Sequence, residues 1–246
     1  MNVTASKVEL KEIESLRRMF LQENTFQFVH DKCHLYGWAD TYVFKIDDMV
    51  VGYGSVWGSE KREDRDAIFE FYTKPRYRKF SDVVFREFAN VSQARLIECQ
   101  TNEPELSSML FVHCANVNAE AILFEDRHTT SFSSHDVVFS RHPTEQGSGS
   151  DMGGFMLEQD GEVVATGGFI TNYNFPYIDI YMDVKEAFRH KGYGTLIVQE
   201  LKRVAYELNK VPSARCNVNN FISKATLLKA GFAVCGYMAK GEIKKA

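Results

Sequence analysis

The hexapeptide RHKGYG, Arg189 to Gly194, decides the fold because it joins a strand-like segment to a helix-like one. Residues 177–184 (YIDIYMDV) alternate apolar and polar side chains and are rich in β-branched and aromatic types, which predicts a strand. Residues 195–208 place their apolar side chains on one helical stripe, which predicts an amphipathic helix. Gly192 and Gly194 permit a tight turn between the two elements. We therefore expect a strand-to-helix loop here.

This loop has the chemistry of an anion-binding cradle. The first amides of a helix have no acceptor within the helix, and the helix dipole places partial positive charge at the same end. Arg189 and Lys191 add two formal charges. The loop is not a P-loop, because no GxxxxGK followed by Ser or Thr occurs, and Ile197 stands where a dinucleotide fingerprint requires its third glycine. The loop is thus expected to bind phosphate, but not as either of those two motifs.

A second motif follows the predicted helix. Residues 211–218 predict another strand, and Asn220 and Ser223 open a short helical run that ends at Gly231, a favourable C-cap. The joint occurrence of R-x-x-G-x-G and N-x-x-S-x-x-x-L-x-K-x-G-F resembles the GCN5-related N-acetyltransferase (GNAT) superfamily, most closely its FR47-like branch, over residues 154–243. The resemblance implies an α/β (α+β) fold of the acyl-CoA N-acyltransferase type, with a mixed, mostly antiparallel sheet flanked by helices.

The same resemblance implies acetyl-CoA as the co-substrate and gives it a binding site. Its pyrophosphate would lie on the loop amides, and its pantetheine arm would pair with the backbone at the end of strand 177–184. Asn220 matches a position whose side chain commonly meets the pantetheine, and Ser223 matches a position that is usually small. The residues expected to bind the co-substrate are Met182, Asp183, Val184, Arg189, His190, Lys191, Gly192, Tyr193, Gly194, Thr195, Asn220 and Ser223.

The expected catalytic residues lie on the strand before the loop. Attack on a thioester requires a neutral amine, so a base has to remove a proton from the ammonium form of the acceptor. Asp179 and Asp183 are the carboxylates of this strand and share a face with Tyr181, a pattern that is also typical of a solvated strand face. Many family members carry a tyrosine that protonates the departing thiolate. Leu227 occupies that position here, so Tyr181 or Tyr237 is left as a substitute acid.

The first half of the chain resembles a degenerate copy of the second. The hairpin-like segment 42–57 matches segment 155–170, so that Gly54 aligns with Gly167. Residues 9–35 supply two opening helices to the first copy, and the second copy has no counterpart of them. We therefore expect a tandem arrangement of two GNAT-like units.

The first copy is expected to have lost its co-substrate site. Ser81 and Val83 stand where the loop of the second copy has its two glycines, and their side chains would block close approach of a pyrophosphate. The Gly- and Ser-rich stretch 146–154 (QGSGSDMGG) is the expected junction. The expected domains are a degenerate GNAT-like domain over residues 1–145 and a catalytic, acetyl-CoA-binding domain over residues 146–246.

Composition limits the setting in which the protein acts. The chain has 246 residues and a net charge of -4, and its basic residues form no stripe, so no nucleic-acid partner is expected. It has no apolar signal region at its start and no long apolar run, so we expect a cytoplasmic protein without membrane attachment. The five cysteines are widely spaced, which indicates reduced thiols. His30, Cys33 and His34 have ligand-like spacing, but no second set of ligands completes a metal site, so no metal is expected.

These patterns favour an N-acetyltransferase that moves an acetyl group from acetyl-CoA to a primary amine of a small-molecule acceptor. A non-catalytic CoA-binding or acyl-CoA-binding module is the main alternative, because the family tyrosine is missing. A protein or peptide N-acetyltransferase is a third possibility, and it would need an open groove across the strand ends. The sequence leaves the identity of the acceptor and the oligomeric state open.

Overall fold

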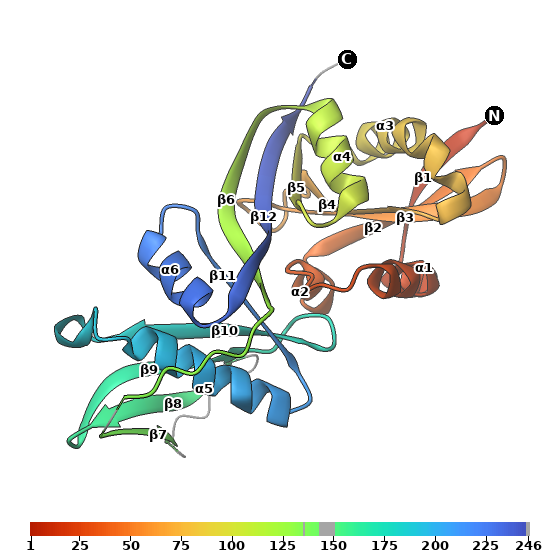
Figure 1. Cartoon of the computed structure of the whole chain (residues 1–246). Helices are drawn as coiled ribbons and strands as arrows, with labels where there is room; N and C mark the ends of the chain where they lie inside the picture. Colours follow the sequence, from red (N-terminus) through yellow and green to blue (C-terminus); the bar gives the residue numbers. More distant parts are fainter. Residues whose placement is uncertain (135, 143–150, 245–246) are drawn as a thin grey trace. The chain divides into compact units, whose positions relative to one another are not determined.

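The computed structural model describes residues 1–134, 136–142 and 151–244. The chain forms two compact units, which are residues 1–120 with 237–246 and residues 121–236 (Figure 1). Each unit is a mostly antiparallel sheet flanked by helices, as the sequence predicts.

The first unit contains two helices between its first two strands. Its elements are β1 (Val3–Val8), α1 (Leu10–Glu23), α2 (Asp31–Leu35), β2 (Ala39–Ile46), β3 (Met49–Trp57), β4 (Ala67–Thr73), the 3-10 helix η1 (Pro75–Phe80), α3 (Ser81–Ser92), β5 (Leu96–Gln100) and α4 (Pro104–His113). Two longer strands, β6 (Cys114–Asp126) and β12 (Phe232–Ile243), run from one unit into the other.

The second unit repeats this order with fewer helices. Its further elements are β7 (Val137–Arg141), β8 (Asp151–Gln159), β9 (Glu162–Ile170), β10 (Tyr177–Val184), the 3-10 helix η2 (Glu186–Phe188), α5 (Tyr193–Glu207), β11 (Val211–Asn217) and α6 (Phe221–Lys229). The predicted strand 177–184 is confirmed to the residue. The segment between β7 and β8 lies almost entirely outside the described residues, so the expected lack of opening helices in the second copy stays a prediction.

The strand orders of the two units correspond when the order of the second unit is read from its last strand to its first. The first unit has the order β1-β2-β3-β4-β5-β12, and the second has β6-β11-β10-β9-β8-β7. Only one pair in each unit is parallel among the registers described, β4 with β5 and β10 with β11. In each unit the strand beyond β5 or β11 comes from the other half of the sequence, because β12 pairs with β5 and β6 pairs with β11.

Because of this exchange, the two compact units divide the chain after residues 120 and 236, while the expected domain boundary after residue 145 stays a prediction. Residues 121–145 lie in the second unit, and residues 237–246 lie in the first. The reason is that β6 and β12 form their ladders outside the half that encodes them, and alternation in a strand does not reveal its partner. The Gly- and Ser-rich junction 146–154 lies mostly outside the described residues.

The matching hairpins confirm the internal repeat. The turn between β2 and β3 consists of Asp47 and Asp48, and the turn between β8 and β9 consists of Asp160 and Gly161, all with positive φ. Two-residue turns of this kind suit the twist of a hairpin. The registers also agree, since Tyr42 lies opposite Gly54 and Phe155 lies opposite Gly167.

Helices cover the two sheets differently. In the first unit α1 and α2 lie on one face and α3 lies on the other (Figure 1), where Phe20 and Phe88 are among the buried side chains of the respective cores. In the second unit α5 and α6 contribute to a single core that contains Ile180, Ile197 and Leu227. No helix among those of the described residues of this unit corresponds to α1 and α2. Among the described residues of this unit, no helix covers the face of β10 opposite α5.

No helix in the described part of the chain is long and apolar enough to span a lipid bilayer.

Candidate active site in the second unit

The two parallel strands of the second unit separate at a defined point. β10 and β11 are paired over Tyr177–Asp179, which lie beside Val211–Ser213. β6 pairs with the other edge of β11, and β9 pairs with the other edge of β10. In the registers described, residues 180–184 of β10 therefore have no strand on the β11 side. A free strand edge of this kind can pair with an extended ligand, and the predicted residues Met182, Asp183 and Val184 lie on it.

The loop that follows β10 leads into α5, whose first backbone amides have no acceptor within the helix. His190 has φ +63° and Gly192 has φ +88°, and Gly192 is the N-cap of the 15-residue helix α5. The first hydrogen bond of the helix runs from Leu196 N to Gly192 O at 3.0 Å. The amides of residues 193–195 therefore precede the helical ladder and have no acceptor within it. Together with the helix dipole, they form an anion-binding position.

Contacts on either side fix the shape of this loop. Arg189 Nε donates a hydrogen bond to the carbonyl of Val184 at 3.2 Å, which ties the loop to the end of β10. A Cβ atom on Gly194 would lie 3.1 Å from Cγ2 of Thr226 on α6 and 3.5 Å from Cγ2 of Val184. Gly194 thus brings the start of α5 close to both β10 and α6.

The remaining residues of the loop and of the first turn of α5 differ in exposure. Lys191 is exposed, and its Nζ lies 4.9 Å from the centre of the Phe188 ring. Tyr193 and Thr195 are buried, and the Tyr193 hydroxyl donates to Oε1 of Gln159. Tyr193 and Thr195 can therefore meet an anion through their backbone amides, whereas Lys191 offers its side-chain charge.

The second motif opens α6. Asn220 is the N-cap of this helix, and its Oδ1 accepts a hydrogen bond from the backbone N of Ser223 at 3.0 Å. An asparagine that uses its oxygen in this way retains its NH₂ group as a donor. The structure therefore gives Asn220 a helix-capping role, and its contact with a pantetheine stays a prediction.

The three candidate catalytic residues share the face of β10 opposite α5, but their surroundings differ. Asp179 is 3% exposed, and its Oδ2 lies 3.3 Å from Nε of Arg215 on β11. Arg215 also donates a hydrogen bond to the hydroxyl of Tyr173. Asp183 is exposed. Only Asp179 lies at the point where β10 and β11 diverge.

Tyr181 lies across the neighbouring strands. Its hydroxyl donates to Oδ1 of Asp151 at 2.7 Å. Cβ atoms built on Gly153 and Gly168 would lie 2.8 Å and 2.7 Å from the same hydroxyl oxygen, so both glycines leave room for it. The hydroxyl is thus held toward β8, and Tyr181 is 37% exposed.

No hydroxyl replaces the missing family tyrosine at its own position. Leu227 is 3% exposed and belongs to the core of the second unit. Tyr237, the other substitute considered from the sequence, begins the segment that belongs to the first unit.

In the first unit, the side chain of Glu105 occupies the position between the end of β4 and the start of α3, which corresponds to the glycine loop of the second unit. Glu105 on α4 accepts a hydrogen bond from the backbone N of Thr73, the last residue of β4, at 3.0 Å. It also accepts one from the hydroxyl of Ser81, the first residue of α3, at 2.7 Å. Burial raises the pKa of Glu105 despite these hydrogen bonds. With Val83 at the second glycine position, this arrangement supports the prediction that the first unit binds no CoA.

The two histidines of the first unit's histidine and cysteine cluster each lie close to a glutamate carboxylate. His34 Nε2 lies 2.6 Å from Oε2 of Glu70, and His30 Nε2 lies 3.4 Å from Oε1 of Glu98. Burial raises the pKa of the Cys33 thiol to about 12. No group of three or more metal-ligating side chains occurs among the residues described.

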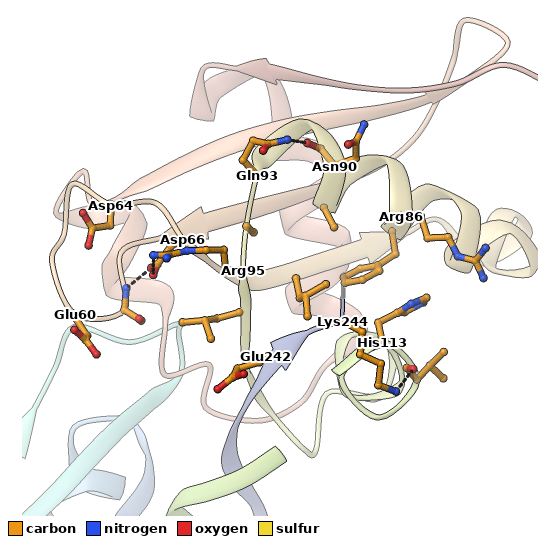
Figure 2. A pocket seen from close by; sticks show the side chains of 17 residues that line it. Glu60, Asp64, Asp66, Arg86, Asn90, Gln93, Arg95, His113, Glu242 and Lys244 are labelled. Atoms are coloured by element: carbon orange, nitrogen blue, oxygen red, sulfur yellow. Dashed lines mark hydrogen bonds and ion pairs between the residues drawn. The ribbon is translucent and has the colours of Figure 1, made fainter. Parts of the chain in front are cut away.

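A large cavity of about 1080 Å³ in the first unit lies away from its diverging strands (Figure 2). It is lined by residues at the start of β5, including Arg95 and Leu96, and by Glu242 and Ile243 at the end of β12. Asp66 Oδ2 lies 3.2 Å from Nη2 of Arg95, so this pair neutralises charge within the lining. β4 and β5 diverge at their other ends, so this cavity does not correspond to the site in the second unit.

Sequence reasoning missed three polar residues that shape these two places. Arg215 is the only charged residue of β11, and a lone charge in an otherwise uncharged strand is a signal for a buried partner. Asp151 lies within the Gly- and Ser-rich junction 146–154, and its sequence context gives no signal of its contact with Tyr181. Glu105 gave no signal in the sequence of its contacts with Thr73 and Ser81.

Comparisons with known proteins agree with this geometry. Residues 118–232 match the model of the acetyltransferase (GNAT) family. No curated protein sequence matched the chain at a significant level. Since the matching model describes the family as a whole, the FR47-like branch stays a prediction.

Solved structures share the fold over almost the whole chain. A GNAT-family acetyltransferase from Colwellia psychrerythraea has a TM-score of 0.75 at 14% identity, covering 98% of this chain and 100% of its own. A tandem GNAT protein from the clavulanic acid biosynthesis pathway has a TM-score of 0.58 at 12% identity, covering 100% of both chains. A GCN5-related N-acetyltransferase from Sphaerobacter thermophilus also has a TM-score of 0.58 at 12% identity, covering 99% of this chain and 96% of its own.

The anion-binding start of α5, the diverging strands β10 and β11, and the family match fall within the same part of the chain. Residues 118–232 therefore form an acetyltransferase (GNAT) family domain, and the chain as a whole has the fold of GNAT acetyltransferase structures.

Proposed function

We propose that the protein is an N-acetyltransferase that transfers an acetyl group from acetyl-CoA to a primary amine of a small molecule. The observation that carries this proposal is the free edge of β10, which begins after Asp179 and leads directly into the glycine loop at the start of α5. A free strand edge and an anion-binding helix start suit a ligand with an extended arm and a pyrophosphate.

The order of these features sets the direction of the co-substrate. Its pyrophosphate would lie on the amides of residues 193–195, and its arm would run along β10 from Val184 back toward Asp179. The thioester would then lie near the point where β10 and β11 diverge, beside Asp179 and Ser213. An amine that enters there would attack the thioester carbonyl, so that a C–N bond forms and the C–S bond breaks.

Two carboxylates on this face support a cationic acceptor. Asp179 and Asp183 carry negative charge that attracts an alkylammonium group, and Asp179 is the better placed of the two to accept its proton. The guanidinium of Arg215 lies 3.3 Å from Oδ2 of Asp179 and orients this carboxylate. Loss of the thiolate requires little assistance, because a thiol has a pKa of about 8.5.

All five cysteines are free thiols, which supports the expectation that the protein acts in the reducing cytoplasm.

A protein or peptide acceptor is the second candidate. It is favoured by the lack of a counterpart of α1 and α2 among the described residues of the second unit, because those helices cover the corresponding sheet face of the first unit. A non-catalytic CoA-binding module is the third candidate, since Leu227 provides no hydroxyl at the family position.

Release of free thiol from acetyl-CoA distinguishes the candidates. The assay compares a panel of primary amines with lysine-containing and free-amino-terminal peptides, and it uses Gly194→Asp as the matched negative control. An aspartate suits the first turn of a helix and its carboxylate repels the pyrophosphate, but its Cβ would lie 3.1 Å from Cγ2 of Thr226. Thermal melting of this variant therefore accompanies the assay and separates loss of binding from loss of fold. Amine-dependent release by the wild type that is lost in Gly194→Asp supports the proposal. Release with peptides alone would favour the second candidate, and acetyl-CoA binding without release from any amine or peptide would favour the third.

A further inference from the structure

A segment before β7 is fastened along the outside of α5. We call residues 126–132 the strap. Lys202 of α5 is 5% exposed, and its Nζ lies 2.6 Å from Oδ1 of Asp126 and donates to the carbonyl of His128 at 2.7 Å. The same ammonium donates to the carbonyl of Ala230 at 2.8 Å. A buried and fully engaged lysine fixes this end of the strap firmly.

The strap has a second attachment nearer the start of α5. The backbone N of Phe132 donates to Oε1 of Gln199 at 3.1 Å, and Nε2 of Gln199 donates to the hydroxyl of Thr130. Gln199 precedes Lys202 by almost one helical turn. The strap therefore runs along α5 toward its N-terminus, and it is held in place before any ligand binds.

The strap ends with an aromatic ring at the glycine loop. A Cβ atom built on Gly192 would lie 2.3 Å from Cζ of Phe132, so the ring packs directly against this glycine. Phe132 is nevertheless 40% exposed. An apolar ring thus lies partly exposed beside an anion-binding helix start and the cations Arg189 and Lys191.

We propose that Phe132 forms the wall of the nucleotide end of the acyl-CoA site and stacks on the adenine base. The inference rests on the proposed co-substrate. In CoA the adenosine is joined to the pyrophosphate, so a pyrophosphate on the loop brings the base close to Gly192 and to the ring packed against it. Bases stack on aromatic side chains with a gain of about tenfold or more in affinity. The two attachments of the strap favour a fixed wall over a plug that has to be displaced.

The test compares two ligands by calorimetry, acetyl-CoA and acetyl-4′-phosphopantetheine, which lacks the adenosine together with its 3′-phosphate and one phosphate of the pyrophosphate. We expect Phe132→Ala to weaken acetyl-CoA binding about tenfold or more and to leave acetyl-4′-phosphopantetheine binding unchanged. Phe132→Trp should retain the affinity for acetyl-CoA, and Phe132→Leu, which keeps an apolar side chain, should lose it. Phe111→Ala, which removes an exposed aromatic ring from the first unit, is the matched control and should bind both ligands as the wild type does.

Unchanged or tighter binding of acetyl-CoA to Phe132→Ala would overturn the inference while leaving the proposed function intact. An equal loss of affinity for both ligands would also overturn it, because the ring would then shape the loop rather than hold the base. A wild type that binds no acetyl-CoA would remove the proposed function and this inference together. Thermal melting of each variant separates loss of binding from loss of fold.

Discussion

Asp179 on β10 and Arg215 on β11 form an ion pair at the point where the two strands diverge, with 3.3 Å between Oδ2 and Nε. The pair places a negative charge beside the expected position of the thioester and holds it on a buried, oriented side chain. Arg215 is itself held by the hydroxyl of Tyr173. The arrangement is suited to receiving a cationic acceptor and its proton.

Asp179→Asn should lower kcat by about 100-fold or more, because general base catalysis contributes a factor of this size. Its affinity for acetyl-CoA should stay at the wild-type value, since the proposed phosphate and pantetheine contacts are elsewhere. Asp183→Asn, an exposed carboxylate on the same face, is the control and should change kcat only a few-fold. Wild-type turnover in Asp179→Asn, with acetyl-CoA saturating, would exclude Asp179 as the base.

Tyr181→Phe should lower kcat less than about tenfold. The variant loses the hydrogen bond to Asp151, but a thiol with a pKa of about 8.5 departs readily without an acid. Steady-state kinetics over a range of pH measures the effect. A loss of 100-fold or more would show that Tyr181 protonates the thiolate and that the hydroxyl leaves Asp151 during turnover.

Glu103→Gln should change how the stability of the protein depends on pH. Burial raises the pKa of Glu103 from its ordinary 4.5 to about 8, although its carboxylate accepts hydrogen bonds from two backbone amides at the start of α4. Because the folded pKa exceeds the unfolded one, the stabilising contribution of this group is complete below pH 4.5 and is lost as the pH rises through about 8. The loss amounts to roughly 3–6 kcal/mol.

Denaturant unfolding between pH 4.5 and pH 8.5 measures this contribution. The free energy of unfolding of the wild type should fall over this range relative to that of Glu103→Gln. Glu14→Gln, an exposed carboxylate on α1, serves as the control and should follow the wild type. Parallel curves for the wild type and Glu103→Gln would show that Glu103 titrates in its ordinary range.

Arg17→Met should destabilise the first unit by about 3–5 kcal/mol, because it leaves a buried carboxylate without its guanidinium. Arg17 Nε lies 3.2 Å from Oε1 of Glu70, whose side chain is fully buried. Burial alone would raise the pKa of Glu70, but the charges of His34 and Arg17 lower it to about 2. Arg18→Met, which changes an exposed neighbour, should unfold as the wild type does.

The pH dependence gives a second readout of the same interaction. A folded pKa below the unfolded value contributes stability above pH 4.5, and this contribution is lost as the pH falls toward 2. The wild type should therefore lose more stability than Arg17→Met between pH 4.5 and pH 2.5. An equal loss in both proteins would show that Arg17 does not hold the charge on Glu70.

Local patterns predicted most of the fold because they depend on neighbouring residues. The strand 177–184, the helix that follows the glycine loop and the two matched hairpins all agree with the structure. The exchange of β6 and β12 could not be predicted, since a strand that alternates apolar and polar residues fits the edge of either sheet. For the same reason, the division into compact units after residues 120 and 236 could not be predicted, and the domain boundary expected at stretch 146–154 stays a prediction.

Only those parts of the candidate site that are continuous in sequence could be predicted. The loop and the motif of Asn220 are short and continuous in sequence, so they could be read directly. The partners Arg215 and Phe132 come from other elements, and only folding brings them to Asp179 and Gly192. Contacts between residues that are distant in the sequence produce no periodic pattern of apolar and polar residues, so the sequence does not predict them.

Calorimetric titration with acetyl-CoA tests the assignment of the site to the second unit most directly. The wild type should bind at one site per chain, and Gly194→Asp should abolish that binding. Asn209→Asp is the matched control, because it adds the same charge at an exposed position whose positive φ both asparagine and aspartate tolerate, and it should bind as the wild type does. Absence of binding by the wild type, two sites per chain, or unchanged affinity in Gly194→Asp would contradict the assignment.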